Sequence, residues 1–155
     1  MRLVAGVGVE GDAHAGATVQ HLHQKRKDPS RPNLRQVHLI HSELFEVLRG
    51  HGFDVGPGDL GENVTTHGVD LLSLPEGAEL HLGESAVVRL TGLRTPCVLI
   101  DRFCAGLMKE LIADAAAKKY LAGVMSVVTA SGEVRPGDMV RVVLAEGVRR
   151  ALVPI

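Results

Sequence analysis

The chain has 155 residues, of which 45% are hydrophobic and 23% are charged, a balance typical of a globular domain. This length predicts one domain, residues 1–155, and the formal net charge of -1 provides no basic field that would hold a nucleic acid. No apolar run approaches the roughly 18 residues of a membrane span, so we expect no membrane partner and a cytoplasmic location.

Aromatic residues make up only 3% of the chain, Trp is absent and Gly occurs 18 times. The core must therefore consist of aliphatic side chains, and the glycines predict many tight turns between short strands. The two cysteines, Cys97 and Cys104, are too few for a disulfide framework. We expect both to be free thiols in a reducing compartment.

The first 36 residues predict a short strand followed by two loops. Apolar residues between Leu3 and Val9 are interrupted by glycines, which indicates a strand that runs into a glycine loop. Residues 21–36, HLHQKRKDPSRPNLRQ, are polar and contain two prolines. They predict a basic loop with Lys25, Arg26, Lys27, Arg31 and Arg35.

The next segments predict a strand, a helix and an irregular loop. Val37, Leu39 and Ile40 indicate a strand, after which Ser42 is expected to cap a helix from Glu43 to Arg49 or His51. Residues 54–63, DVGPGDLGEN, hold three glycines and a proline, which exclude regular structure. From the residues alone, the polar side chains of this loop satisfy its own turns; they are Asp59, Glu62 and Asn63.

The rest of the chain predicts strands at regular spacing and one further helix. The strands are expected at residues 64–66, 69–73, 79–82, 86–93, 123–129 and 139–144. Residues 106–120 predict an amphipathic helix, because Leu107, Leu111 and Ala115 recur on one helical face. The fold class is therefore mainly β, a barrel or sandwich with a few short helices.

Cys97 follows the predicted strand 86–93 and is expected at an exposed rim. Arg94 and Arg102 would favour its thiolate, the form that attacks sulfur or binds a soft metal. A small buried hydrophobic role is equally compatible with the residues. Cys104, just before the predicted helix, is expected to be structural, and the spacing of the two cysteines is not that of a zinc or redox motif.

The close spacing of several residues of metal-ligating type suggests a zinc site as one hypothesis. These residues are Asp12, His14, His21, His23, His38 and His41. No spacing matches a helical motif with two histidines, so we expect no zinc. Arg35 could hold a phosphate with two hydrogen bonds or could be a surface charge. A basic loop, two glycine loops and a rim cysteine together predict a site for a small anionic ligand.

Five separated blocks of the sequence resemble the MOSC family, which is named for the C-terminal domain of molybdenum cofactor sulfurase. The blocks, which cover nearly the whole chain in the family's order, are VEGDAHAG (9–16), LRQVHLI (34–40), PGDLGENVTTHGVDLLSLPEGAELHLG (57–83), LTGLRTPC (90–97) and GVMSVVTASGEVRPGD (123–138). The resemblance implies a β-barrel-like fold that binds molybdenum cofactor (molybdopterin).

The resemblance also implies roles for individual residues. Cys97 would be the catalytic residue and the molybdenum ligand, or a carrier of sulfur. The cofactor's phosphate would be held by Arg35, Asn63 and Arg94, with Asp59 and Glu62 shaping the loop beside it. Related proteins reduce N-hydroxylated compounds or receive and pass sulfur, and binding of pyridoxal phosphate is associated with the family in general.

The chain begins almost at the first block, so we expect it to lack the N-terminal strand and barrel domain of larger members. We also expect no iron-sulfur or haem module and no aminotransferase-like domain. Electrons or sulfur would then come from a separate protein. Two functions stay open: a cofactor-dependent reductase or sulfurtransferase component, and a carrier module that binds an anionic pterin or persulfide sulfur without turnover.

Overall fold

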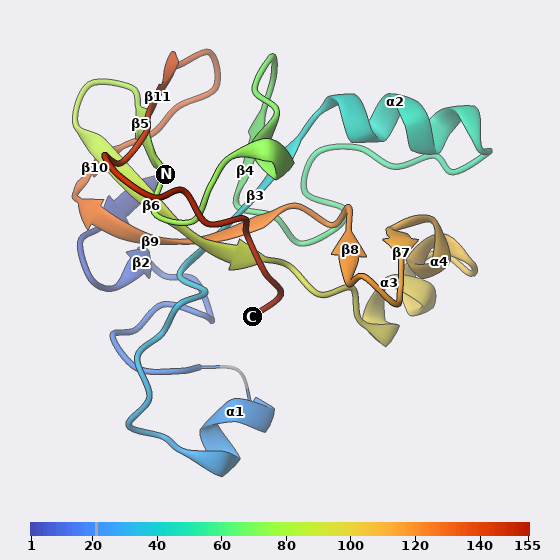
Figure 1. Cartoon of the computed structure of the whole chain (residues 1–155), viewed down its shortest axis with the longest axis horizontal. Helices are drawn as coiled ribbons and strands as arrows, with labels where there is room; N and C mark the ends of the chain where they lie inside the picture. Colours follow the sequence, from blue (N-terminus) through green and yellow to red (C-terminus); the bar gives the residue numbers. More distant parts are fainter. Residues whose placement is uncertain (21) are drawn as a thin grey trace.

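The computed structural model describes residues 1–20 and 22–155, and its largest element is a six-stranded sheet that curls into a half-barrel (Figure 1). The strand order is β11-β5-β6-β9-β3-β4, and only β3 and β4 are parallel. Their bounds are β3 Val37–His41, β4 Val64–Thr66, β5 Glu79–Leu82, β6 Ala86–Leu93, β9 Val124–Ala130 and β11 Val140–Val143. The predicted mainly β, barrel-like fold is confirmed.

Alternation of side chains explains why the sheet has one buried face. Along β6, Val88 and Leu90 are buried while Arg89 between them is exposed, which is the period of a strand covered on one side. A second sheet packs against this core, with the order β10-β1-β2. It consists of β1 (Arg2–Val4), β2 (Gly8–Val9) and β10 (Gly132–Glu133), so the first segment forms two strands rather than the single one predicted.

A second core lies on the helical side of the molecule (Figure 1). Ile40, near the end of β3, packs there with Leu48 and with other residues of three helices. These helices are α2 (Glu43–Gly50), α3 (Val98–Phe103) and α4 (Leu107–Glu110). The predicted helix after Ser42 is confirmed as α2. Ser42 occupies its N-cap position without a capping hydrogen bond, because its Oγ lies 2.9 Å from His67 Nδ1 instead.

The predicted helix at residues 106–120 is wrong. The segment makes only the short α4 and then a hairpin of β7 (Ile112–Asp114) and β8 (Lys119–Tyr120). The Asp114 carboxylate accepts the backbone N–H of Ala117 at 2.9 Å, which closes a turn inside the Ala-rich run. This local hydrogen bond competes with the helix, so the helical propensity of the run does not decide its structure.

Two further predictions need correction. Residues 69–73 do not form a strand, because Leu71–Ser73 is a short 3-10 helix (η1) in which the Ser73 hydroxyl donates to the carbonyl of Asp70 at 3.0 Å. The basic loop of residues 21–36 contains the helix α1 (Leu22–Lys27), while His21 lies outside the described residues. Within residues 1–20 and 22–155, no helix combines the length and apolar character needed to cross a bilayer.

The register of three strands brings distant segments of the chain together. His38 in β3 is opposite Met125 in β9, and Met125 is opposite Gly92 near the end of β6. Just beyond the strands, the backbone N–H of Arg94 donates to the carbonyl of Gly123 at 3.0 Å. The start of β3 and the end of β6 therefore lie on either side of β9.

Candidate functional site

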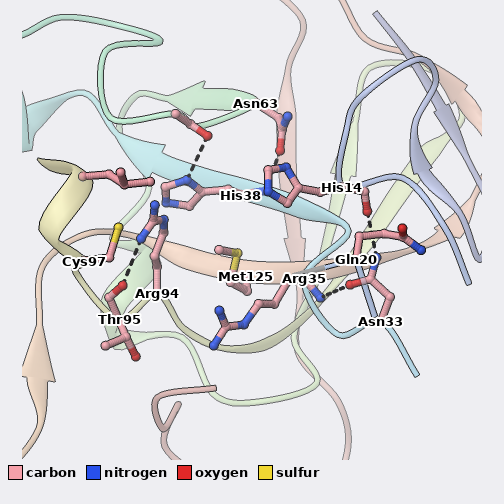
Figure 2. A pocket seen from close by; sticks show the side chains of 12 residues that line it. His14, Gln20, Asn33, Arg35, His38, Asn63, Arg94, Thr95, Cys97 and Met125 are labelled. Atoms are coloured by element: carbon pink, nitrogen blue, oxygen red, sulfur yellow. Dashed lines mark hydrogen bonds between the residues drawn. The ribbon is translucent and has the colours of Figure 1, made fainter. Parts of the chain in front are cut away.

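A cavity of about 250 Å³ opens where these strand ends meet the loops that follow β2 and precede β4 (Figure 2). Its wall comes from residues within five segments of the chain: 14–20, 33–38, 61–63, 94–99 and Met125. Small-molecule sites usually measure about 300–1,000 Å³, so this cavity of about 250 Å³ is slightly smaller than most of them.

Four of the six residues expected at a ligand site lie in the wall of this cavity. They are Arg35, Asn63, Arg94 and Cys97. They come from three separate regions of the sequence, which the sheet register brings together. Figure 2 shows Arg94 beside Cys97 and Thr95, with Arg35 on the other side of Met125.

The other two expected residues, Asp59 and Glu62, are not in the wall. Asp59 is exposed, and its Oδ2 accepts the N–H of Gly56 at 2.9 Å. Glu62 is buried, and its Oε1 accepts the N–H of Gly58 at 2.6 Å and the hydroxyl of Thr65 at 3.1 Å. Both carboxylates therefore hold the shape of the loop, because its backbone N–H groups need acceptors.

The two arginines form a cationic wall without a matching carboxylate. Among the described residues, neither Arg35 nor Arg94 has a carboxylate oxygen within 4.0 Å. Arg94 donates from one terminal nitrogen to the carbonyl of Thr95 at 2.9 Å, while the Nε of Arg35 is buried with no partner in the described part of the chain. Burial lowers the pKa of Arg35, and the nearby charges of Arg94 and Arg31 lower it further. An anion in the cavity would relieve both effects.

Cys97 is a half-buried free thiol between the end of β6 and the first residue of α3. The strand end was expected, but α3 was not. Cys104 follows the last residue of α3 and packs against the helical core. Cys97 is the only thiol among the described residues that line the cavity, so a soft metal held there would receive one thiolate from this wall.

The zinc hypothesis gains no support from the described residues. No group of three or more His, Cys, Asp or Glu side chains within them is arranged to hold a metal ion. His38 is instead bonded to backbone carbonyls, and His14 is paired with Asp12. His21 and the side chain of His23 lie outside the described part of the structure.

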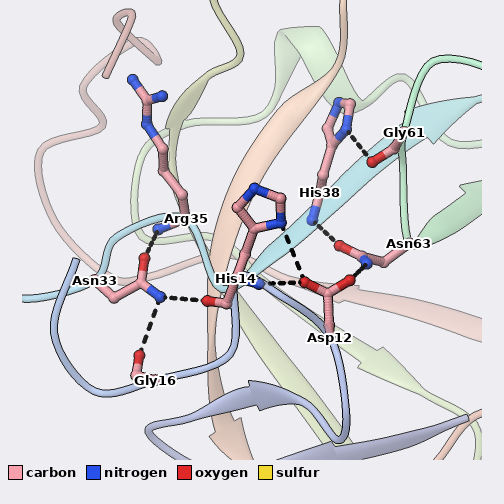
Figure 3. Close-up of polar contacts among 8 residues, drawn as sticks. All are labelled: Asp12, His14, Gly16, Asn33, Arg35, His38, Gly61 and Asn63. Carbon is pink, nitrogen blue, oxygen red and sulfur yellow. Dashed lines mark hydrogen bonds and ion pairs between the residues drawn. The ribbon is translucent and has the colours of Figure 1, made fainter. Parts of the chain in front are cut away.

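Asn63 links two walls of the cavity through its side chain (Figure 3). Its Oδ1 accepts the backbone N–H of His38 at 2.9 Å, and its Nδ2 donates to Asp12 Oδ2 at 3.2 Å. Both ends of the amide are therefore used within the protein. Asn63 positions β3 and the glycine loop of residues 11–16, and it keeps one N–H for a ligand at most.

Asn33 makes the corresponding link on the other side (Figure 3). Its Nδ2 donates to the carbonyls of His14 and Gly16 at 2.8 and 3.0 Å, and its Oδ1 accepts the backbone N–H of Arg35 at 3.0 Å. Asn33 is 5% exposed, so these bonds are largely shielded from water. It fixes the glycine loop and the backbone of Arg35 in one arrangement.

His38 is a buried, neutral histidine in the cavity wall. Its Nε2 lies 2.7 Å from the carbonyl of Ala122, and its Nδ1 lies 3.4 Å from the carbonyl of Gly61. Carbonyls only accept, so the shorter distance assigns the ring hydrogen to Nε2. Burial, together with the charge of Arg94, lowers the pKa of His38 to about 4.

We expect the stability of the protein to fall as the pH falls from the ordinary histidine pKa of 6.5 to about 4. In this range the unfolded chain binds a proton at His38 and the folded protein does not, so acid favours unfolding. The loss from this group is about 3 kcal/mol, complete near the lower pKa. Urea unfolding across this range measures how the free energy of unfolding depends on pH. This dependence should be weaker in His38→Gln and the same as in wild type in His67→Gln, an exposed control. Equal slopes for all three proteins would contradict the assignment.

Reasoning from sequence missed several residues of the cavity, notably His14, Asn33, His38 and Met125. His14 and His38 attracted attention only as possible zinc ligands. Asn33 lies two residues before Arg35, and a polar residue at that place in a predicted loop carries no signal of its own. Met125 is a strand residue whose pattern indicates only burial.

Solved structures with a similar fold include three bacterial proteins. YiiM from Escherichia coli has a TM-score of 0.63 and 18% identity over 97% of this chain and 66% of its own. YiiM from Geobacillus stearothermophilus has a TM-score of 0.59 and 22% identity over 72% of this chain and 56% of its own. YuaD from Bacillus subtilis has a TM-score of 0.70 and 25% identity over 91% of this chain and 84% of its own. This chain thus spans less than two thirds of either YiiM chain.

Comparison with curated proteins found none whose sequence matches. The family model for the MOSC domain matches residues 13–141. This range includes every described residue that lines the cavity, among them the two arginines and Cys97. With the shared fold, this match shows that the chain belongs to the MOSC domain family.

Proposed function

We propose that the cavity binds molybdenum cofactor or a related anionic sulfur species. Arg35 and Arg94 hold its anionic group, and Cys97 binds the metal or carries sulfur. The observation that carries this proposal is that two arginines without a carboxylate partner among the described residues share a cavity with a free thiol. A guanidinium in a partly buried site gains most from a phosphate or another oxyanion.

The residues present fit such a cofactor. The Nε of Arg35 is a buried donor that lacks a partner in the described residues, and a phosphate oxygen would satisfy it. The thiolate of Cys97 is a soft ligand of the kind that molybdenum accepts. Leu99 and Thr95 are exposed at the mouth, so a ligand larger than the cavity would extend past them into solvent.

The bound cofactor would supply a redox-active metal, and the chain's own residues would orient it. Asn33 fixes the backbone of Arg35, and the carbonyl of Gly123 fixes that of Arg94, so both guanidinium groups extend from anchored positions. We do not extend the proposal to pyridoxal phosphate, because no lysine is among the described residues that line the cavity.

The reaction would need a second protein. A reductase requires an electron-transfer partner, and a sulfur carrier requires a sulfur donor. We place this chemistry in the cytoplasm, which suits two free cysteines, because that compartment keeps thiols reduced.

Metal and pterin analysis tests the hypothesis that the cavity binds molybdenum cofactor. The protein and its Cys97→Ala variant are purified from cells that make molybdenum cofactor. We expect molybdenum and pterin in the wild type and a lower molybdenum content in Cys97→Ala, because the variant lacks the protein's thiolate ligand. Cys104→Ala, which removes the thiol outside the cavity, is the matched control and should keep its molybdenum. A wild type without molybdenum and without pterin would rule out the cofactor reading.

A separate mass measurement tests the hypothesis that Cys97 carries sulfur. After exposure to a cysteine desulfurase and cysteine, intact-protein mass spectrometry should show one additional sulfur atom on the wild type and on Cys104→Ala, but not on Cys97→Ala. A wild type that never gains this mass would argue against sulfur transfer through Cys97.

A further inference from the structure

A histidine and an aspartate on the glycine loop form a pair at the edge of the cavity. The Nδ1 of His14 lies 3.2 Å from Asp12 Oδ1, and the backbone N–H of His14 donates to the same oxygen at 2.6 Å. His14 is in the cavity wall, whereas Asp12 is not among the residues that line the cavity. The pair is separate from the two arginines and the thiol that carry the proposed function.

The pair fixes which ring nitrogen of His14 holds the hydrogen. A carboxylate only accepts hydrogen bonds, so the Nδ1 that faces Asp12 carries the hydrogen in the neutral ring. The Nε2 on the far side of the ring is then a free acceptor (Figure 3). No hydrogen bond to this Nε2 exists among the described residues.

Asp12 is itself held in place. Its second oxygen, Oδ2, accepts from Asn63 Nδ2 at 3.2 Å, and Asn63 is bonded to the backbone of His38 in β3. Asn33 fixes the carbonyl of His14 at 2.8 Å from the opposite side. The loop that carries His14 is therefore bonded to β3 through Asn63 and to the backbone of Arg35 through Asn33. These bonds hold the imidazole in place beside a ligand in the cavity.

We propose that His14 exchanges a proton with the ligand bound in the cavity and that Asp12 is its positioning residue. This inference rests on the proposed function, because it needs an anionic ligand held by Arg35 and Arg94. The ligand belongs to the class of weak acids, with a thiol, hydroxyl or oxyanion group that gains or loses a proton.

The proton has a complete path. His14 Nε2 accepts it from the ligand, and the resulting imidazolium is stabilised by the carboxylate of Asp12. The side chain of His14 is 64% exposed, so the ring can return the proton directly to solvent. His38 in the same wall is a poorer candidate, because both of its ring nitrogens face backbone carbonyls and it is 4% exposed.

The experiment uses sulfate as the probe, since sulfate stays a dianion near neutral pH and takes up no proton itself. Isothermal titration calorimetry at about pH 6.5, near the ordinary pKa of histidine, is repeated in two buffers of different ionisation enthalpy. The difference between the binding enthalpies observed in the two buffers gives the number of protons taken up on binding. The other titratable or charged groups that line the cavity are Arg35, Arg94, Cys97 and His38, and all four stay unchanged in the variant that tests His14.

We expect wild type to take up protons on binding sulfate and His14→Asn to lose this uptake while still binding. Asn keeps a donor for Asp12 but has no group in place of Nε2. His67→Gln, an exposed histidine outside the cavity, should behave as wild type. Unchanged uptake in His14→Asn would overturn the inference, whereas failure of wild type to bind sulfate would count against the proposed function and with it the inference.

A second measurement needs no ligand. Nitrogen NMR of labelled histidines distinguishes the two neutral tautomers, and His14 in wild type should carry its hydrogen on Nδ1. Asp12→Asn should lose this preference while the protein stays folded, as judged by its remaining amide spectrum. Predominance of the Nε2–H tautomer for His14 in wild type would contradict the role of Asp12.

Discussion

Gly123→Ala is expected to destabilise the fold by about 3 kcal/mol or more. Gly123 has a φ of +87°, and a Cβ there would strike the carbonyl oxygen of Leu39 in β3. It would also lie 2.7 Å from Ile40 Cγ1 and 3.1 Å from His38 Nε2. The carbonyl belongs to a strand paired with β9, so it cannot move aside without breaking the pairing.

Gly137→Ala provides the matched control for this prediction. Gly137 has nearly the same φ, +90°, but a Cβ there meets nothing within 4 Å. Gly137→Ala should lower the free energy of unfolding by about 1 kcal/mol, because it introduces backbone strain and no clash. Urea unfolding of the three proteins measures the difference. If the two variants lose equal stability, the close approach of β3 and residue 123 is not as the structure describes.

Arg35→Gln is expected to weaken binding of an oxyanion such as sulfate by about 10- to 100-fold. A hydrogen bond to a charged group contributes about 1.5–3 kcal/mol, and each 1.4 kcal/mol is a factor of about ten in affinity. The same change should not lower the stability of the protein. Arg35 has no carboxylate partner among the described residues, and it lies close enough to Arg94 and Arg31 for their charges to oppose its own.

The control for this variant is Arg89→Gln, which makes the same change in charge on an exposed residue of β6 outside the cavity. Calorimetry with sulfate and thermal unfolding are measured on all three proteins. Arg89→Gln should bind as wild type does. Loss of stability without loss of sulfate affinity in Arg35→Gln would show that Arg35 supports the fold rather than a ligand.

The six strands of the large sheet could be predicted, because the alternation that marks them is a local property of the sequence. In β5 and β6 the alternation of buried and exposed side chains is visible in the sequence, and glycines mark the turns. The pattern failed at residues 106–120, where high helical propensity gave way to a turn held by the Asp114 carboxylate. A hydrogen bond between a side chain and a backbone group three residues away competes with a helix, and composition does not show which one forms.

The candidate site was predictable only in part. Arg35 and Cys97 were candidates from the residues alone, and the family resemblance gave them, with Asn63 and Arg94, roles toward a cofactor. All four line one cavity, although those roles stay predictions. Asp59 and Glu62 were expected to satisfy the turns of their loop and to shape it beside the ligand, and their carboxylates do accept the backbone N–H groups of that loop. Asn33 was missed because its importance lies in three bonds to backbone atoms that only the folded chain brings within reach.

The sequence by itself determined that this protein is mainly β, that its core is aliphatic and that it carries the blocks of one family. Those properties depend on composition and on periodicity along the chain, which folding does not alter. The tertiary structure decided which polar residues face the cavity and which close their own turns. That division depends on the register between β3, β9 and β6, because pairing Met125 with both His38 and Gly92 is what brings Arg35, Arg94 and the loop of His14 around one space.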